Sequence, residues 1–200
     1  MKTLILTIAI AVSTLFGISQ TTYAATVTQQ VTQLSNVSNI SEIEVHGNVQ
    51  VYLSEGDTNQ VKVYNNYYAE NALVQDENGV LRITSYGPEK LVVWVTANQL
   101  AKLSAYDNAE VKSFGKFSAI DLDVRLFNNA SAKLDMDTFS ASISLDDCTT
   151  ARITGKITNG NIQYTHTSDL NTIGLEVSNL VTTVKTHRPF HMHPTEFASL

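Results

Sequence analysis

The sequence is poor in residues that cross-link or interrupt a chain. One cysteine, Cys148, occurs among 200 residues, which excludes an intramolecular disulfide and leaves no cysteine near residue 24 to carry a lipid anchor. The thiol is expected to be a small buried apolar group, with a reactive thiol as the alternative. Two of the three prolines, Pro189 and Pro194, lie near the C-terminal end, so long regular strands are hardly interrupted elsewhere.

Charge and long apolar runs are also scarce. Charged residues form 16% of the chain, and 13 Lys and Arg stand against 19 Asp and Glu, for a net charge of −6. This balance argues against nucleic acid or an anionic membrane surface as a partner. No apolar run reaches the roughly 20 residues of a membrane-spanning helix, so no transmembrane segment is expected.

Motifs of known chemistry are likewise missing from the sequence. It contains no Ser–His–Asp pattern, phosphate loop, zinc spacing or dinucleotide fingerprint. No catalytic residue, metal site or cofactor is therefore predicted, and a non-enzymatic protein is favoured.

Residues 1–24 are typical of a secretory signal peptide. Lys2 supplies a positive start, an apolar run covers residues 4–16, and small residues around Ala24 form a cleavage site. We expect export to the periplasm or cell surface, with an uncleaved anchor as the alternative reading.

The remaining chain is interpreted as one domain between two less regular ends. Residues 25–39 are expected to be a linker, residues 40–185 a β-domain, and residues 186–200 a disordered tail. The tail contains three histidines that offer metal ligation as an alternative: His187, His191 and His193.

Alternating apolar residues predict strands in the first half of the β-domain. The alternation runs from Ile43 to Leu53, with a slip at Gly47 that we interpret as a bulge. Asn78-Gly79 between apolar pairs predicts a type I′ hairpin. The segment Leu91–Val95 has apolar residues on both faces, which predicts a strand covered on both sides.

From Leu103 the chain repeats with a period of 21 residues. Segments beginning at Leu103, Val124 and Leu145 share one pattern, and a weaker copy begins at Leu170. A single unit cannot bury its apolar face, whereas stacked units can, so the repeat predicts a β-solenoid. In this alignment Phe127 is buried between Tyr106 and Cys148, and Asp, Asn and Thr pairs form the turns.

The spaced apolar residues resemble a known bacterial domain family, the putative auto-transporter adhesin, head GIN domain, which is common in Bacteroidetes and of unknown function. The resemblance covers about residues 40 to 180. It is carried by Ile43-x-Val45-x-Gly47, Val51-x-Leu53-x-x-Gly56-Asp57-x-x-x-Val61-x-Val63, Gly79-x-Leu81-x-Ile83, Val93-x-Val95 and Leu100-x-x-Leu103.

That resemblance implies an exported, right-handed parallel β-solenoid, here with N-terminal hairpin strands, and no established catalytic residues. Family members often carry glycine in the repeat turns. This chain instead has residues that can also make such turns: Asp107, Asn108, Asn128, Asn129, Thr149 and Thr150.

Two groups of side chains are candidates for ligand contacts. Aromatic and amide side chains that could stack on and hydrogen-bond to sugars gather at Tyr64, Asn65, Asn66, Tyr67 and Tyr68. Alternate carboxylates, about 6.6 Å apart along a strand, occur at Asp121, Asp123, Asp135 and Asp137. Their spacing also fits the carboxylate pair of an inverting glycosidase.

Three functions follow from these features. The favoured one is an exported envelope protein that binds a surface glycan or an envelope protein without catalysis. The alternatives are a polysaccharide-processing enzyme that uses the Asp pairs, and a structural module of a larger envelope assembly.

Overall fold

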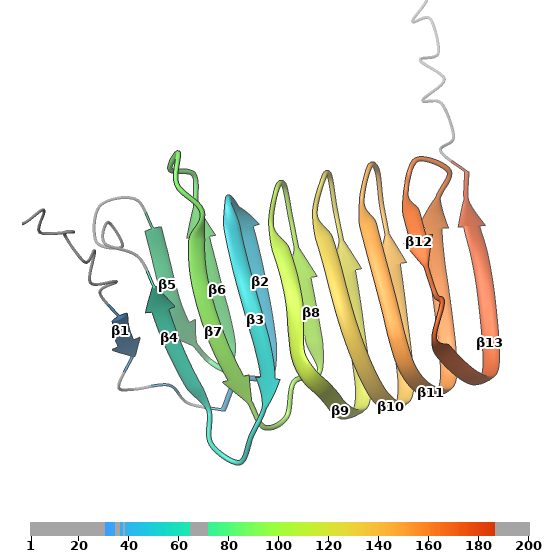
Figure 1. The fold of residues 1–200 in the computed structure, drawn as a ribbon, viewed down its shortest axis with the longest axis horizontal. Helices are drawn as coiled ribbons and strands as arrows, with labels where there is room; N and C mark the ends of the chain where they lie inside the picture. The colour runs from blue at the N-terminus through green and yellow to red at the C-terminus, as the bar shows by residue number, and fades with distance from the viewer. Residues whose placement is uncertain (1–30, 35–36, 38, 65–71, 187–200) are drawn as a thin grey trace, which may run out of the picture.

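The computed structural model describes residues 31–34, 37, 39–64 and 72–186, and every regular element within them is a β-strand (Figure 1). The predicted all-β class is therefore confirmed. In chain order the strands are β1 (Val31–Leu34), β2 (Glu42–Gly47), β3 (Val49–Glu55), β4 (Gln60–Tyr64), β5 (Ala72–Glu77), β6 (Val80–Ser85), β7 (Leu91–Ala97), β8 (Lys102–Ala105), β9 (Glu110–Leu126), β10 (Ser131–Leu145), β11 (Thr150–Thr165), β12 (Asp169–Asn171) and β13 (Leu175–Lys185).

The strands form one sheet that folds back on itself into two facing layers (Figure 1). The first layer contains β1, β4, β7 and β3, followed by the N-terminal parts of β9, β10 and β11. The second layer contains β5, β6, β2 and β8, followed by the C-terminal parts of the same long strands and most of β13. Each long strand thus bends from one layer into the other. In the described part of the chain, we find no helix with the length and apolar character needed to cross a membrane.

The sheet is mixed, so the expected parallel β-solenoid describes only part of it, and antiparallel pairs occur in the N-terminal half, where hairpin strands were predicted. Most neighbouring strands are parallel, but β1–β4, β4–β7 and β5–β6 are antiparallel. The β5–β6 pair is the predicted hairpin, with φ of 53° at Asn78 and 81° at Gly79, as a type I′ turn requires. The right-handed sense of the winding stays a prediction.

The order of strands in space departs from the order in sequence. The pair β2 and β3 lies between the pair β6 and β7 on one side and the pair β8 and β9 on the other. Gly47, where a bulge was predicted, is instead the corner between β2 and β3, with φ of 82°. A side chain there would overlap the Ser85 carbonyl oxygen, so the close corner requires glycine.

From β8 onward, successive passes of the chain stack in sequence order, but the period changes. Paired residues of β9 and β10 are separated by 21 positions in the sequence as far as the pair Lys112–Lys133. From the pair Lys116–Asp135 onward the separation is 19 positions. The difference is a bulge in β9, where residues 113–115 oppose the single residue Leu134. Gly115, with φ of 81°, provides the backbone turn within it.

Inward-facing residues of both layers form one continuous core, because successive side chains of a strand alternate between faces. In the second layer, Leu103, Val124 and Ile143 are opposite one another and fully buried. Strand β7 follows the same rule: Val93 and Val95 are fully buried, whereas Val92 and Trp94 are half-buried on the outer face. The expectation that this strand is covered on both sides is therefore wrong.

The predicted burial of Phe127 and Cys148 is also wrong. Cys148 is exposed and Phe127 is half-buried. Because the period shortens from 21 to 19, the residue beside Phe127 in the next pass is Asp146, and the third turn residue with positive φ is Asp147. A shift of two residues preserves the alternation, so Ala109, Ala130 and Ala151 are buried as the repeat predicts.

Candidate binding surface

The outer face of the first layer carries three aromatic rings, Tyr52, Trp94 and Phe114, which we call the aromatic cluster. Tyr52 and Trp94 are opposite each other on β3 and β7, with ring centroids 4.8 Å apart and planes at 27°. Trp94 and Phe114 have centroids 5.1 Å apart and planes at 57°. The Gln50 amide donates a hydrogen bond of 2.9 Å to the Tyr52 hydroxyl. These contacts fix the rings beside one another on an open face.

Phe114 owes its position to the bulge in β9. The two additional residues of this strand push the Phe114 side chain away from the core, so that it is 63% exposed and lies against Trp94. Bulges re-aim side chains in this way in many sheets. An exposed aromatic ring beside two half-buried ones makes an apolar patch, and exposed apolar patches are typical of contact sites.

Two lysines near the aromatic cluster share one carboxylate. Glu110 accepts from Lys112 at 2.6 Å and from Lys90 at 3.3 Å. Burial acts to raise the pKa of Glu110, but the hydrogen bonds and charges of Lys112 and Lys90 outweigh it and leave that pKa below its ordinary value. The carboxylate thus stays ionised and holds the Lys112 side chain.

Of the predicted tyrosine group, Tyr64 is the only residue that the structure describes. It lies on β4 opposite Val92 of β7, one row away from Lys62 and Trp94 on the same outer face. The neighbours Val61 and Val63 are buried, so Tyr64 belongs to the solvent side of the first layer. The candidates Asn65, Asn66, Tyr67 and Tyr68 lie outside the described residues.

Two of the predicted aspartates, Asp121 and Asp137, line a groove of about 820 Å³ where the long strands bend. Glu55 contributes a third carboxylate and accepts a hydrogen bond from the Ser118 amide at 3.1 Å. Lys116 lies 3.8 Å from Asp137, and the exposed Ile120 adds apolar surface.

The other two aspartates lie apart from this groove. Asp123 is on the outer face of the second layer, 2.7 Å from Arg125. Asp135 is half-buried, and its backbone N–H donates to the Ser113 hydroxyl at 2.8 Å. The structure therefore brings together one member of each predicted pair, rather than either pair as a unit. Among the described residues, no three His, Cys, Asp or Glu side chains are grouped to hold a metal ion.

The outer face of the second layer has charges of both signs that neutralise one another. Glu42 and Lys102 are 2.6 Å apart, and Glu44 accepts from Arg82 at 2.9 Å. The hydrogen bond that Lys102 donates to Glu42 raises the pKa of Lys102, and the one that Arg125 donates to Asp123 raises that of Arg125. The pairs leave little net charge on this face.

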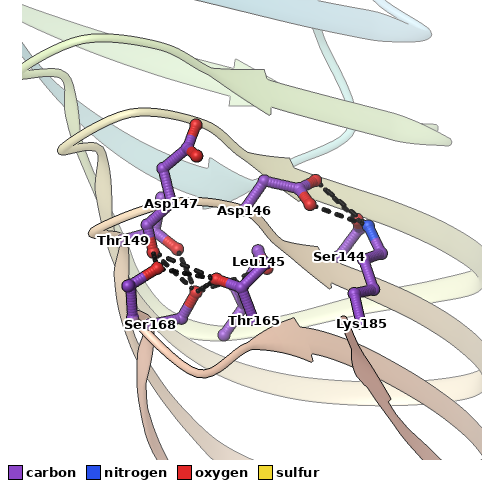
Figure 2. A network of polar contacts seen from close by, with 9 residues as sticks. Ser144, Leu145, Asp146, Asp147, Thr149, Thr165, Ser168 and Lys185 are labelled. Carbon is purple, nitrogen blue, oxygen red and sulfur yellow. Dashed lines mark hydrogen bonds and ion pairs between the residues drawn. The ribbon is translucent and has the colours of Figure 1, made fainter. Parts of the chain in front are cut away.

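One end of the stack carries the turns that contain Asp107, Asn128 and Asp147. At this end aromatic contacts are followed along the stack by polar ones. His46, Tyr106 and Phe127 stack in sequence, with centroids 4.3 and 4.8 Å apart and nearly parallel planes. The next position along the stack is Asp146, which binds Lys185 at 3.0 Å (Figure 2).

A network of hydroxyl groups follows at the same end. Thr165 and Ser168 have their hydroxyl oxygens 2.7 Å apart, and these oxygens lie 3.2 and 3.0 Å from the Asp147 carbonyl oxygen (Figure 2). These bonds tie the turn at residues 165–168 to the preceding turn. The network therefore serves to hold the C-terminal passes in register.

Sequence reasoning missed Tyr52, Trp94 and Phe114 as members of one surface. A signal was present: Tyr52 and Trp94 occupy the alternate, outward positions of strands that are otherwise rich in valine. Their proximity could not be predicted, because it depends on β3 lying beside β7 rather than beside a strand next to it in sequence.

Comparison with solved structures identifies proteins of similar fold. A putative adhesin from Parabacteroides distasonis ATCC 8503 matches with a TM-score of 0.57 and 16% identity, over 78% of this chain and 79% of that one. A putative adhesin from Bacteroides fragilis NCTC 9343 gives a TM-score of 0.43 and 12% identity, over 78% and 96%. A putative lipid binding protein from Parabacteroides distasonis gives 0.42 and 11%, over 79% and 97%. The search of curated proteins gave no match.

A family model decides the assignment. The model of the family described as "Putative auto-transporter adhesin, head GIN domain" matches residues 39–196, a range that includes every strand from β2 to β13. The resemblance found in the spaced apolar residues is thereby confirmed. The chain belongs to the putative auto-transporter adhesin, head GIN domain family.

Proposed function

We propose that the protein is an exported, non-enzymatic adhesin-like module that binds glycans on the outer face of its first layer. The observation that carries this proposal is the aromatic cluster, in which Phe114 is 63% exposed beside Tyr52 and Trp94. The apolar faces of sugar rings pack against aromatic rings, and Gln50 and Tyr64 add polar groups on the same face. The adhesin names of the family and of the similar Parabacteroides structure agree with a surface role.

Export rests on the sequence of residues 1–24, with cleavage near Ala24 and a destination in the periplasm or at the cell surface. An exported location would expose the first layer to envelope polysaccharides. Mass spectrometry of the protein from the envelope fraction tests this directly. An N-terminus at Ala25 supports export, whereas an intact Met1 in the cytoplasmic fraction contradicts it.

A glycan array probed with residues 25–200 tests the binding proposal. The variant Trp94→Ala/Phe114→Ala should lose at least about tenfold in affinity for any glycan that the wild type binds, equivalent to about 1.4 kcal/mol. Tyr86→Ala is the matched control, because Tyr86 is 72% exposed but lies on another part of the molecule. An array without binders, or equal binding by the double variant, would reject the proposal.

The groove at the bends favours a second candidate function, cleavage of a polysaccharide. It brings Asp121, Asp137 and Glu55 around one space of about 820 Å³. A reducing-end assay on envelope polysaccharides tests this function. Activity that disappears in Asp121→Asn or Asp137→Asn would establish the enzyme, and no activity in the wild type would exclude it for those substrates.

A further inference from the structure

The row of outward residues that contains Tyr52 and Trp94 continues along the stack as a row of cations. Tyr52 is opposite Lys112, Lys112 is opposite Lys133, and Lys133 is opposite Arg152. Neighbouring strands are about 4.8 Å apart, so three positive side chains follow one another at the spacing of the sheet. We call Lys112, Lys133 and Arg152 the cation row.

These side chains point away from the core, because the residues that precede them in each strand, Val111, Ala132 and Ala151, are buried. Lys133 and Arg152 are exposed, and within the described residues neither forms an ion pair. Lys133 and Arg152 are thus available to an anion from solution, whereas Lys112 is paired with Glu110.

Adjacent like charges in a sheet are unfavourable. On the second layer of this protein each cation has a carboxylate beside it, as with Lys102 and Glu42 or Arg125 and Asp123. The chain as a whole is acidic, with a net charge of −6, so two adjacent unpaired cations, Lys133 and Arg152, do not follow from composition. The repulsion between these two side chains is suited to an external ligand that neutralises it.

The geometry points to a linear acidic polysaccharide, and we propose that it lies along the stack across β7, β3, β9, β10 and β11. This deepens the proposed function and rests on it. Sugar rings would pack on Trp94 and Tyr52, while carboxylates or sulfates of the following sugars would meet Lys133 and Arg152. A monosaccharide unit is similar in length to the strand spacing, so one charged group per sugar matches one cation per strand. The guanidinium of Arg152 can bind such an oxyanion in bidentate fashion.

Polygalacturonate is a suitable probe, with dextran as a neutral polymer and oligo(dT) as an anion without sugar acids. The variant Lys133→Gln/Arg152→Gln should bind polygalacturonate at least about tenfold more weakly than the wild type, and its affinity should depend less on salt. The control variant Arg82→Gln/Lys156→Gln removes the same charge from positions outside the row. It should bind as the wild type does.

The length of the ligand provides a second measurement. The residues from Trp94 to Arg152 cover five neighbouring strands, about 19 Å at the usual strand spacing. Affinity for galacturonate oligomers should therefore rise with length until the oligomer covers this distance, and then level off.

Four results would overturn the inference. If the two double variants weakened binding equally, the affinity would depend on net charge and not on the cation row. If oligo(dT) bound more tightly than polygalacturonate, the ligand would be another polyanion and not an acidic sugar. Binding of dextran that requires Trp94 but is insensitive to the cation row would leave the proposed function intact and reject the acidic ligand. Absence of any sugar binding would reject both.

Discussion

Leu126 and Phe127 are neighbours in sequence but face opposite sides of the sheet, and their truncation should separate core packing from surface stacking. Leu126 is fully buried between Ala105 and Leu145 of the adjacent strands. Parallel ladders hold the backbone on both sides, so the cavity left by Leu126→Ala cannot collapse. We expect a loss of about 3–4 kcal/mol, within the usual range for a buried leucine.

Phe127 stacks on the ring of Tyr106 and is half-buried. Tyr106 stacks on it at 4.8 Å, whereas the position on its other side is the carboxylate residue Asp146. A stacked pair contributes about 0.5–1.5 kcal/mol beyond its buried area, so Phe127→Ala should lose about 1–2 kcal/mol. Asn128→Gly serves as a control: glycine accepts the φ of 61°, and only the 3.0 Å bond to Asp107 is lost.

Urea unfolding at constant m-value measures these differences as shifts in midpoint. The expected order of destabilisation is Leu126→Ala, then Phe127→Ala, then Asn128→Gly. If Phe127→Ala were as damaging as Leu126→Ala, the assignment of Phe127 to the surface and of residue 126 to the core would be refuted.

Three further perturbations test other features. Gly155→Ala should destabilise far more than Gly115→Ala in thermal melts, because a Cβ at Gly155 overlaps the Met136 carbonyl while the space at Gly115 is empty; equal losses would contradict this packing. Since the pKa of Glu110 is lowered on folding, its stabilisation is present above the ordinary value of 4.5 and is lost as pH falls through the lower folded value. The difference in unfolding free energy between wild type and Glu110→Gln should therefore be present at neutral pH and disappear in acid. A difference independent of pH would refute the role of this carboxylate. Cys148 should react with a thiol reagent in the folded protein as fast as in urea, because it is exposed, and protection would contradict its position.

Local signals in the sequence predicted the strands well. Alternation from Ile43 to Leu53 and the Asn78-Gly79 turn depend on residues that are near one another in the chain, and both appear where expected. The repeat was found for the same reason. Its period was wrong after Val124, because the two additional residues near Phe114 look like part of the unit until the pairing is known.

The arrangement of the strands was harder to predict than the strands themselves. Nothing local in the sequence places β2 and β3 between β6, β7 and the later strands, since that order arises from pairing over long distances. The same limit applies to the binding surface. Tyr64 was chosen for its composition and lies on the proposed face, but the contact between Trp94 and Phe114 depends on both the strand order and the bulge.

The sequential order of the passes from β9 to β11 has a consequence for how such a protein can change in evolution. Among the described strands, β10 is paired only with β9 before it and β11 after it. Duplication of one 19-residue segment would therefore add a strand to each layer without disturbing the interleaved N-terminal half, as in other repeat proteins. The number of copies of this segment in the gene would set the length of the outer face in steps of about 4.8 Å. The position of the aromatic rings at the other end of the stack would not change.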